Sequence, residues 1–461
     1  MMLKPRSWIY LAVLVIGACS APAVDPPRPR SLLSPDTDSR AELQAMIDAT
    51  PAGGTLVLPD GTYDVGPAAT GYFGLRLAQP ITLRGSGATV LRQRVGTPAS
   101  YRLIQVDAPG VTIERLELDG NADALTTDTH RHALFIEADG TRVVGVDAHD
   151  FQGDGIYLYN GASNVLLDAV SAHDNRRNGI TLSGQISHVA IRGVSASANA
   201  AQQIDSEPGA PWTVSEVTIS DSIVASPADY GVTVSGSSSL YRSHDWRITG
   251  CTITGGVNVV WADDVSIVAN AITSSTDHPA VKVYRSSDDV TIARNVLTMT
   301  GAALASPSAV YALGTGPGNA PDDLTVVGNT IQSAAPSAFG VRAQGVLAAT
   351  IVGNAISGAD VASAGAAGVY VRATDTTTPV REVAIVGNSI SGHGARGVSV
   401  AGYSVGGVSA QIAALRAVGN AIGGVGPPQT AGMVLDDGLH PVAQADVIGN
   451  SYGAGVTSGR L

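Results

Sequence analysis

The chain is poor in aromatic residues, cysteine and charge. Aromatic residues make up 5% of its 461 residues, with only 4 Phe, whereas Gly accounts for 54. Few aromatic and many β-branched side chains favour a narrow, stacked interior. With Cys19 and Cys251 as the only cysteines, no disulfide framework is expected. The net charge is -12 and no basic stripe with interleaved aromatic residues is apparent, so nucleic acid is not expected as a partner.

The N-terminus has the composition of a secretory signal. Basic residues precede a short apolar run, Trp8 to Ile16, which is too short to span a membrane. Residues 16–19, Ile-Gly-Ala-Cys, resemble the lipobox of bacterial lipoproteins. That resemblance implies a signal peptide of residues 1–18, export across the inner membrane and a lipid on Cys19. Because Ser20 is not Asp, it also implies the outer membrane; the alternative is an ordinary signal peptide.

A short phrase recurs between residues 116 and 209. Three copies align on Ile156, Ile180 and Ile204 at steps of 24 and 24 residues, and an earlier copy puts Leu134 22 residues before Ile156. Apolar and polar residues alternate within each copy, which is the period of a strand with one buried face. A strand repeated every 22 to 28 residues indicates a solenoid. We predict that these four residues and Val232 form one buried column.

A second repeat marks the turns of the later part of the chain. Its asparagines follow Ala, Arg or Gly at spacings of 25, 34, 25, 34, 32 and 30 residues: Asn270, Asn295, Asn329, Asn354, Asn388, Asn420 and Asn450. Because Asn tolerates a left-handed backbone, each is expected to occupy a tight corner.

The start of the folded part predicts a cap for the solenoid. Residues 39–42, Ser-Arg-Ala-Glu, fit a capping box, and Leu43, Met46 and Ile47 lie on one face of the helix that follows. Residues 55–59 and 61–63 predict two strands. Residues 19–35 are rich in proline and predict an extended tether. Because a solenoid grows along one axis, we predict a single domain over residues 36–461 and a monomer.

These features resemble the right-handed parallel β-helix proteins of the pectate-lyase-like superfamily. The resemblance covers nearly all of the chain after the tether and implies an all-β fold acting on carbohydrate. Residues 113–121 and 172–175 look like the catalytic module of alginate C5-epimerases. Those enzymes carry Tyr-Gly-Phe-Asp-Pro-His-Glu one turn earlier, where residues 154–160 here read Asp-Gly-Ile-Tyr-Leu-Tyr-Asn. The catalytic Tyr, Asp and His are therefore not matched, and the phrases found instead resemble phage-type depolymerase modules.

Three carboxylates on neighbouring turns are the main catalytic candidates. Asp154 and Asp205 are two turns apart, and side-chain reach then allows the roughly 6.5–9.5 Å separation of an inverting glycosidase. Asp205 and Glu207 alternate on one face, so one can raise the pKa of the other. We predict that all three line one groove on the outer face of the same sheet. The alternative is that the Asp residues bond turn amides.

Further candidates surround these carboxylates. Arg177 can clamp a sugar carboxylate or hold a carboxylate of the protein, and Arg176 beside it is a candidate for substrate binding. His132 stacks one turn below Asp154 and is a candidate for proton transfer. For each of the three, a solvated turn or loop residue is the alternative.

A last group is assigned to substrate binding. Tyr157, Tyr159 and Trp212 are candidate sugar-stacking platforms or groove packing, and Asn178 lies in the column of Asp154. Lys282 is several turns away and is either a substrate contact or simply exposed. Calcium could bind at three pairs of Asp residues, 263–264, 288–289 and 322–323. Because no dense loop of oxygen ligands occurs in the sequence, no cofactor is expected.

The favoured function is hydrolysis of a polysaccharide by Asp154, Asp205 and Glu207. Because polar residues concentrate between His132 and Glu207, an enzyme is favoured over a binder. The alternatives are a polysaccharide lyase using Arg177 or Lys282, an epimerase, or a non-catalytic envelope lipoprotein that binds glycan. Fold alone does not decide between them.

Overall fold

The computed structural model describes residues 38–124, 130–226, 229–275, 278–300, 307–316, 318–334, 338–358, 367–375, 380–393, 396–405, 408–410, 412–423, 431–435, 444–453 and 456. They belong to one compact unit, Ser34–Leu461. The predicted signal peptide, the tether and Cys19 lie outside the described residues. No helix in the described ranges is long and apolar enough to cross a membrane.

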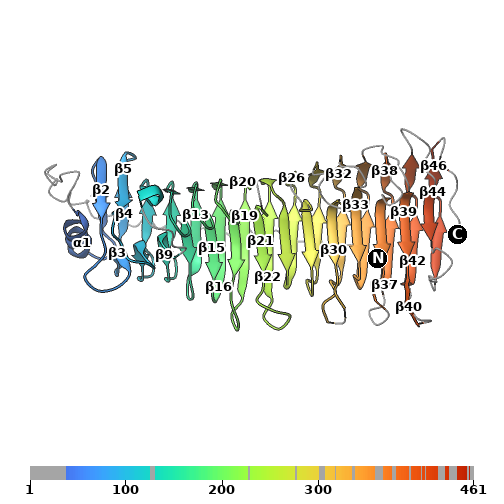
Figure 1. Ribbon diagram of the computed structural model, residues 1–461, viewed down its shortest axis with the longest axis horizontal. Helices are drawn as coiled ribbons and strands as arrows, with labels where there is room; N and C mark the ends of the chain where they lie inside the picture. The colour runs from blue at the N-terminus through green and yellow to red at the C-terminus, as the bar shows by residue number, and fades with distance from the viewer. Residues whose placement is uncertain are drawn as a thin grey trace, which may run out of the picture. The chain divides into compact units, whose positions relative to one another are not determined.

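The unit is built from three parallel sheets through which the chain passes in turn (Figure 1). Successive strands along the chain belong to sheets A, B and C, and each strand pairs with the strand one turn later. The fold is therefore the all-β parallel solenoid that the repeat predicts.

Sheet A contains β1 (Thr55–Leu58), β4 (Thr82–Gly85), β7 (Thr112–Glu114), β10 (Arg142–Val144), β13 (Ser163–Asp168), β16 (Ile186–Arg192), β19 (Val214–Ser220), β22 (Ser243–Thr249), β25 (Ala262–Val268), β28 (Val290–Ala293), β31 (Leu324–Val327), β34 (Ala348–Val352), β37 (Val380–Val386), β42 (Ile412–Val418) and β45 (Ala445–Ile448). Sheet B contains β2 (Gly61–Val65), β5 (Thr89–Gln93), β8 (Glu117–Asp119), β11 (Asp147–His149), β14 (Ser171–His173), β17 (Ser195–Ser197), β20 (Ile223–Ala225), β23 (Thr252–Thr254), β26 (Ala271–Ser274), β29 (Val296–Met299), β32 (Thr330–Ser333), β35 (Ala355–Gly358), β38 (Ser389–Ser391), β43 (Ala421–Gly423) and β46 (Ser451–Tyr452).

Sheet C contains β3 (Phe73–Leu77), β6 (Arg102–Val106), β9 (His132–Ile136), β12 (Ile156–Leu158), β15 (Ile180–Ser183), β18 (Ile204–Glu207), β21 (Val232–Ser235), β24 (Val257–Val260), β27 (Val281–Tyr284), β30 (Ser308–Leu313), β33 (Phe339–Gln344), β36 (Ala367–Arg372), β39 (Arg396–Ala401) and β44 (Ala431–Leu435). A short antiparallel hairpin, β40 (Tyr403–Val405) with β41 (Val408–Ala410), and two helices, α1 (Arg40–Ala49) and the 3-10 turn η1 (Ala122–Ala124), complete the described elements.

The core is the stacked aliphatic column that the sequence predicts. Leu134, Ile156, Ile180, Ile204 and Val232 are direct partners on neighbouring strands of sheet C, and all are fully buried. Because side chains alternate across a strand, the residues between them face outward from sheet C. The register that fixes the core thus also fixes which polar side chains share the outer face.

Helix α1 caps the N-terminal end, but not through the expected capping box. Ser39 is the N-cap residue, yet its side chain makes no capping bond, because its backbone (φ -78°, ψ -5°) is helical rather than extended. Asp38 supplies the acceptor instead: its Oδ1 accepts hydrogen bonds from the backbone N–H groups of Arg40 and Gly66, each at 3.0 Å. Leu43 is buried as expected.

The recurring asparagines lie in corners between sheets A and B, although not in left-handed conformation. The preceding residue takes the positive φ instead, for example Ala269 at 58° and Gly353 at 63°. The asparagines from Asn270 to Asn420 are buried and form a ladder, in which Asn354 Nδ2 donates to Asn388 Oδ1 at 2.9 Å and to the carbonyl of Val326 at 2.9 Å. Asn is needed here because its side chain satisfies backbone groups inside the corner.

Candidate active site

The candidate site lies on the outer face of sheet C, on β12, β15 and β18. Tyr157, Thr181 and Asp205 are direct partners across these strands, and Ser183 is the partner of Glu207. Asp205 and Glu207 therefore face outward, as the alternation predicts.

A buried amide network fixes the turns that lead into these strands. Asn175 Nδ2 donates to Asn199 Oδ1 at 2.9 Å, and Asn199 Nδ2 donates to Gln203 Oε1 at 2.6 Å. Asn175 Oδ1 also accepts a hydrogen bond from the backbone N–H of Phe151 at 3.1 Å. These bonds tie three successive turns together, so the residues that follow each turn reach sheet C in register.

Asp154 points to the outer side of the sheet but is fully buried there. Its Oδ1 accepts a hydrogen bond from the backbone N–H of Asn178 at 2.9 Å, and its Oδ2 accepts one from the Thr181 hydroxyl at 3.1 Å. Burial raises the pKa of Asp154 to about 6, against the opposing effect of the Arg177 charge. Asp154 was predicted to line one groove with Asp205 and Glu207; the structure places it on that side of the sheet but below the surface.

Arg177 joins the carboxylates on either side of it. One terminal nitrogen lies 2.6 Å from Asp154 Oδ2, and the other contacts both carboxylate oxygens of Glu207. Burial works against its charge, but Asp154 and Glu207 outweigh burial and raise the pKa of Arg177. Of the two predicted roles, the structure assigns Arg177 to holding carboxylates of the protein. A guanidinium so held cannot act as a base.

Asp205 and Glu207 form one acid–base pair. Burial, a hydrogen bond to Glu207 and the Glu207 charge raise the pKa of Asp205 well above its ordinary value. Burial alone would raise the pKa of Glu207 too, but hydrogen bonds from Asp205 and Arg177 lower it. The stable state is therefore a protonated Asp205 that donates to an ionised Glu207. Asp205 is 5% exposed, whereas the side chain of Glu207 is 37% exposed, so Glu207 is the member that solvent reaches.

Asn178 supports both members of this pair. Its Nδ2 lies 3.3 Å from Asp205 Oδ2 and 3.4 Å from Glu207 Oε1, and it donates to the Thr181 hydroxyl at 3.1 Å. Asn178 is 1% exposed, so its contacts are with the protein. We predicted a substrate contact, whereas these bonds orient the carboxylates.

His132 lies beside Asp154 but does not pair with it as a cation. The backbone N–H of Asp154 donates to His132 Nδ1 at 3.0 Å, and the same nitrogen is 3.5 Å from Asp154 Oδ2. A ring nitrogen that accepts a hydrogen bond from an N–H group carries no proton. The shorter contact, from the backbone N–H of Asp154, therefore shows that Nδ1 of His132 is unprotonated. The His132 ring also packs 4.7 Å from the Tyr157 ring, centroid to centroid. His132 therefore orients Asp154, and proton transfer between them through Nδ1 is not supported.

An aromatic cluster lies on β9 and β12, two and three turns before Asp205 and Glu207. Tyr157 stacks on Phe135 with centroids 5.2 Å apart, and Tyr159 lies 6.0 Å from Tyr157. Arg102 covers Phe135, its guanidinium carbon 3.5 Å from the ring centroid. Phe135 and Arg102 were not among the predicted site residues, although Phe135 follows the inward Leu134 and so has the phase of an outward residue.

The structure does not bring the other candidates to this cluster. Arg176 turns away and pairs with Asp123 of η1 at 2.8 Å. Lys282 lies on β27, three strands beyond β18 in sheet C. Trp212 is partly exposed in the turn after β18, where its backbone N–H donates to Gly209 O.

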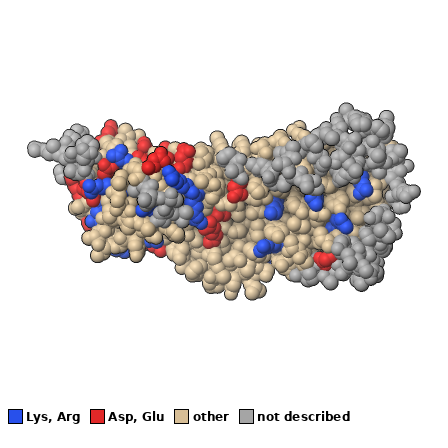
Figure 2. Space-filling view, in the orientation of Figure 1, with Lys and Arg blue, Asp and Glu red and all other residues tan. Residues whose placement is uncertain are grey.

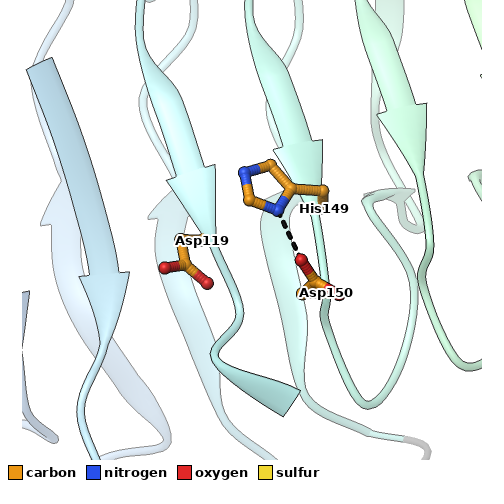
Figure 3. A group of neighbouring side chains, drawn as sticks. All are labelled: Asp119, His149 and Asp150. Atoms are coloured by element: carbon orange, nitrogen blue, oxygen red, sulfur yellow. Dashed lines mark hydrogen bonds and ion pairs between the residues drawn. The ribbon is translucent and has the colours of Figure 1, made fainter. Parts of the chain in front are cut away.

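A second group of ionisable side chains lies on the outer face of sheet B. One ligand atom each of Asp119, His149 and Asp150 fall within 4.8 Å of one another, a spacing that could hold a metal ion (Figure 3). His149 Nδ1 is 2.8 Å from Asp150 Oδ2, and Nε2 is 3.3 Å from Glu117. Both ring nitrogens thus already have carboxylate partners.

The Asp pairs considered for calcium are partly neutralised by arginine. Arg242 contacts Asp263 and lies 2.7 Å from Asp288, while Arg381 contacts Asp322. These carboxylates are therefore accounted for as ion pairs.

Comparison with known proteins identifies the fold. A family model described as the right-handed β-helix region matches residues 107–246, which include Asp154, Asp205 and Glu207. The A-module of mannuronan C-5 epimerase AlgE4 of Azotobacter vinelandii is 19% identical, with a TM-score of 0.54 over 75% of this chain and 90% of that chain. The AlgE6 A-module of the same organism is 18% identical, with a TM-score of 0.50 over 92% of this chain and 96% of that chain. No curated protein matches the sequence. At these identities the likeness establishes the fold and nothing more.

Proposed function

Since the chain is a right-handed parallel β-helix, we propose that it is a carbohydrate-active enzyme that hydrolyses glycosidic bonds of a polysaccharide. The observation that carries the proposal is the Asp205–Glu207 pair on the outer face of β18, in which the pKa of Asp205 is raised and the pKa of Glu207 is lowered. Environments that separate the pKa values of two carboxyls are how one site supplies both an acid and a base. The polysaccharide as substrate class agrees with the names of the two similar structures.

The pair acts as one proton-transfer unit. Carboxyls in hydrogen-bond contact are closer than the roughly 5–5.5 Å or 6.5–9.5 Å found when two carboxyls flank a glycosidic bond. The pair therefore works from one side: Asp205 passes its proton to Glu207, and Glu207 then gives that proton to the glycosidic oxygen. The bond from the anomeric carbon to that oxygen breaks, and the pair becomes doubly charged.

The second step restores the proton. Water adds its oxygen to the anomeric carbon and gives one proton to the pair, so that the enzyme ends with the single proton with which it began. Arg177 and Asn178 stabilise the doubly charged pair between the two steps, because both already bond its oxygens. Asp154 keeps Arg177 in place at 2.6 Å.

We expect that Asp205→Asn and Glu207→Gln remove most activity while the melting temperature changes little. Loss of a proton-transfer group costs on the order of 10²–10⁴ in rate. The measurement is reducing-end release from a polysaccharide panel, with melting followed in parallel. Glu216→Gln, an exposed acid of sheet A that pairs with His188, is the matched control. Near-wild-type turnover in both site variants, with the fold intact, would contradict the proposal.

One observation favours β-elimination as the second candidate. Burial lowers the pKa of Lys282, so more of its amine is unprotonated and available as a general base than in an ordinary lysine. An enzyme that uses Lys282 in this way would leave an unsaturated uronate, which absorbs in the ultraviolet, whereas hydrolysis would not. Absorbance during digestion therefore distinguishes the two.

A further inference from the structure

The outer face of sheet C continues beyond the carboxylates as an ordered row of polar, basic and aromatic residues. Direct strand partners carry it from one turn to the next: Asp205, Thr233, Asn258, Lys282, Tyr311, Arg342 and Tyr370. We call the stretch from Thr233 to Tyr370 the sheet C row. Each step is about 4.8 Å, the spacing of neighbouring strands.

The row is basic in a protein that is acidic overall. The five strands β24, β27, β30, β33 and β36 contain Lys282, Arg342 and Arg372 but no Asp or Glu. The whole chain has a net charge of -12. On the face shown in Figure 2, acidic and basic atoms crowd together toward the N-terminal strands, while the described surface toward the C-terminal strands is mainly tan, with scattered basic and few acidic atoms.

Next to the carboxylate pair, the row offers hydrogen-bonding atoms that the described residues do not use. The hydroxyl of Thr233 and Oδ1 of Asn258 are buried atoms with no hydrogen-bond partner in the described part of the chain. Thr233 is 8% exposed and faces outward, since Val232 and Val234 on either side are in the core. A buried polar group without a partner is costly, so such atoms point to a ligand that completes them.

The cations of the row are held over aromatic rings. Lys282 Nζ lies 4.7 Å from the Tyr284 ring centroid, and the guanidinium of Arg342 lies 4.8 Å from that of Tyr311. No carboxylate among the described residues pairs with Lys282. Lys282, which lies over a ring and has no carboxylate partner among the described residues, is ready to pair with an anion from outside.

We propose that the sheet C row binds an anionic polysaccharide, whose carboxylate or sulfate groups pair with Lys282 and Arg342 while the chain runs along the row to the Asp205–Glu207 pair. This assignment of substrate class rests on the proposed function. Lys282 and Arg342 are two turns apart, so roughly 9–10 Å separates their strands, comparable to the length of a disaccharide. Thr233 and Asn258 lie between Lys282 and Asp205, where they would bond the sugar hydroxyls next to the reacting bond.

The row also corrects one expectation from the sequence. A basic stripe with interleaved aromatic residues does exist, but its members are 24 to 31 residues apart in the chain, so only the strand register reveals it. Single-stranded nucleic acid nevertheless fits it poorly. Its bases would stack on open ring faces, whereas cations cover the rings of Tyr284 and Tyr311.

The test is binding of matched charged and neutral glycans, measured by affinity electrophoresis. The probes are polygalacturonate with its carboxyl-reduced form, dextran sulfate with dextran, and single-stranded oligo(dT). We expect a charged glycan to bind, its neutral counterpart to bind at least about tenfold more weakly, and the affinity to fall as salt rises. The two pairs show whether carboxylate or sulfate is recognised.

Variants assign the binding to the row. Lys282→Met combined with Arg342→Gln should weaken binding of the charged glycan at least about tenfold, because hydrogen bonds to charged groups are lost. Arg247→Gln, an exposed arginine on β22 of sheet A, is the matched control and should bind as wild type does. Equal binding by the double variant with its melting temperature unchanged, equal binding of the neutral probes, or tighter binding of oligo(dT) would each overturn the proposal.

Lysine labelling gives a second readout that does not depend on substitution. Lys282 is the only lysine after Lys4, so amine acetylation within the described residues reports on a single site by mass spectrometry. The bound charged glycan should slow acetylation of Lys282, and unchanged acetylation under saturating glycan would count against the row. Cleavage of a neutral glycan without charged-glycan binding would end this inference and leave the proposed function standing. Binding of the charged glycan without cleavage of any glycan would support binding along the sheet C row and contradict the proposed function.

Discussion

At the scale of single residues, the site depends on how three carboxylates share one cation. Arg177 contacts Asp154 on one side and Glu207 on the other, and Asp205 has no such contact. Glu207 therefore stays ionised and Asp205 keeps its proton. The two carboxyls on this strand thus differ in pKa because burial and the Glu207 charge raise that of Asp205, whereas Asp205 and Arg177 lower that of Glu207.

This division predicts a pH profile of activity. Turnover requires ionised Glu207 and protonated Asp205, so activity should rise as pH passes the lowered pKa of Glu207 and fall as pH passes the raised pKa of Asp205. Because the two carboxyls titrate together, the acidic and alkaline limbs of the profile report pKa values of the pair and not of either residue alone. The measurement is kcat/KM against pH for wild type and Asp205→Asn. A residual activity of Asp205→Asn that keeps the wild-type alkaline limb would contradict the assignment.

At the scale of single elements, the corners between sheets A and B determine how evenly the strands stack. Each corner places a left-handed residue before an asparagine, and the side chain of Asn354, for example, bonds both the turn before and the turn after its own. The ladder therefore couples the register of neighbouring strands, including those of the sheet C row.

We expect Asn354→Ala to destabilise the fold by about 1–3 kcal/mol, because the change leaves buried backbone groups without partners. Asn354 accepts bonds from Asn329 and donates to Asn388, so both neighbouring turns lose a contact. The measurement is denaturant unfolding. Gly353→Ala is the comparison: no atom would meet the added Cβ, so its cost is only that of a φ of +63°. An Asn354→Ala variant as stable as wild type would show that the ladder contributes little.

At the scale of the whole molecule, the remaining proposal concerns where the protein resides. We propose that Cys19 is lipidated and that the protein is anchored at the outer membrane, on the basis of the lipobox resemblance of residues 16–19. In a Gram-negative host the wild type should fractionate with membranes, and Cys19→Ala should appear in the soluble periplasm, since it lacks the lipid acceptor. Identical partition of both proteins into the soluble fraction would refute the anchor.

The sequence by itself determined the solenoid, its buried column and the strands that carry the site. A strand has a side-chain period of two, and the 24-residue steps between Ile156, Ile180 and Ile204 leave little freedom in the register. The outward direction of Asp205 and Glu207 follows from the same alternation. Repeating apolar spacing is local information, so it can be read before the chain is folded.

Only the tertiary structure decided what those side chains do. Arg177 could face a sugar or the protein, and the choice depended on Asp154 and Glu207, which are 23 and 30 residues away in the chain. Contacts between residues that are distant in the chain also decided the burial of Asp154, the acceptor role of His132 Nδ1 and the formation of the basic sheet C row. Burial and charge pairing depend on which turns stack on one another, and these distances through space are fixed only when the whole register is formed.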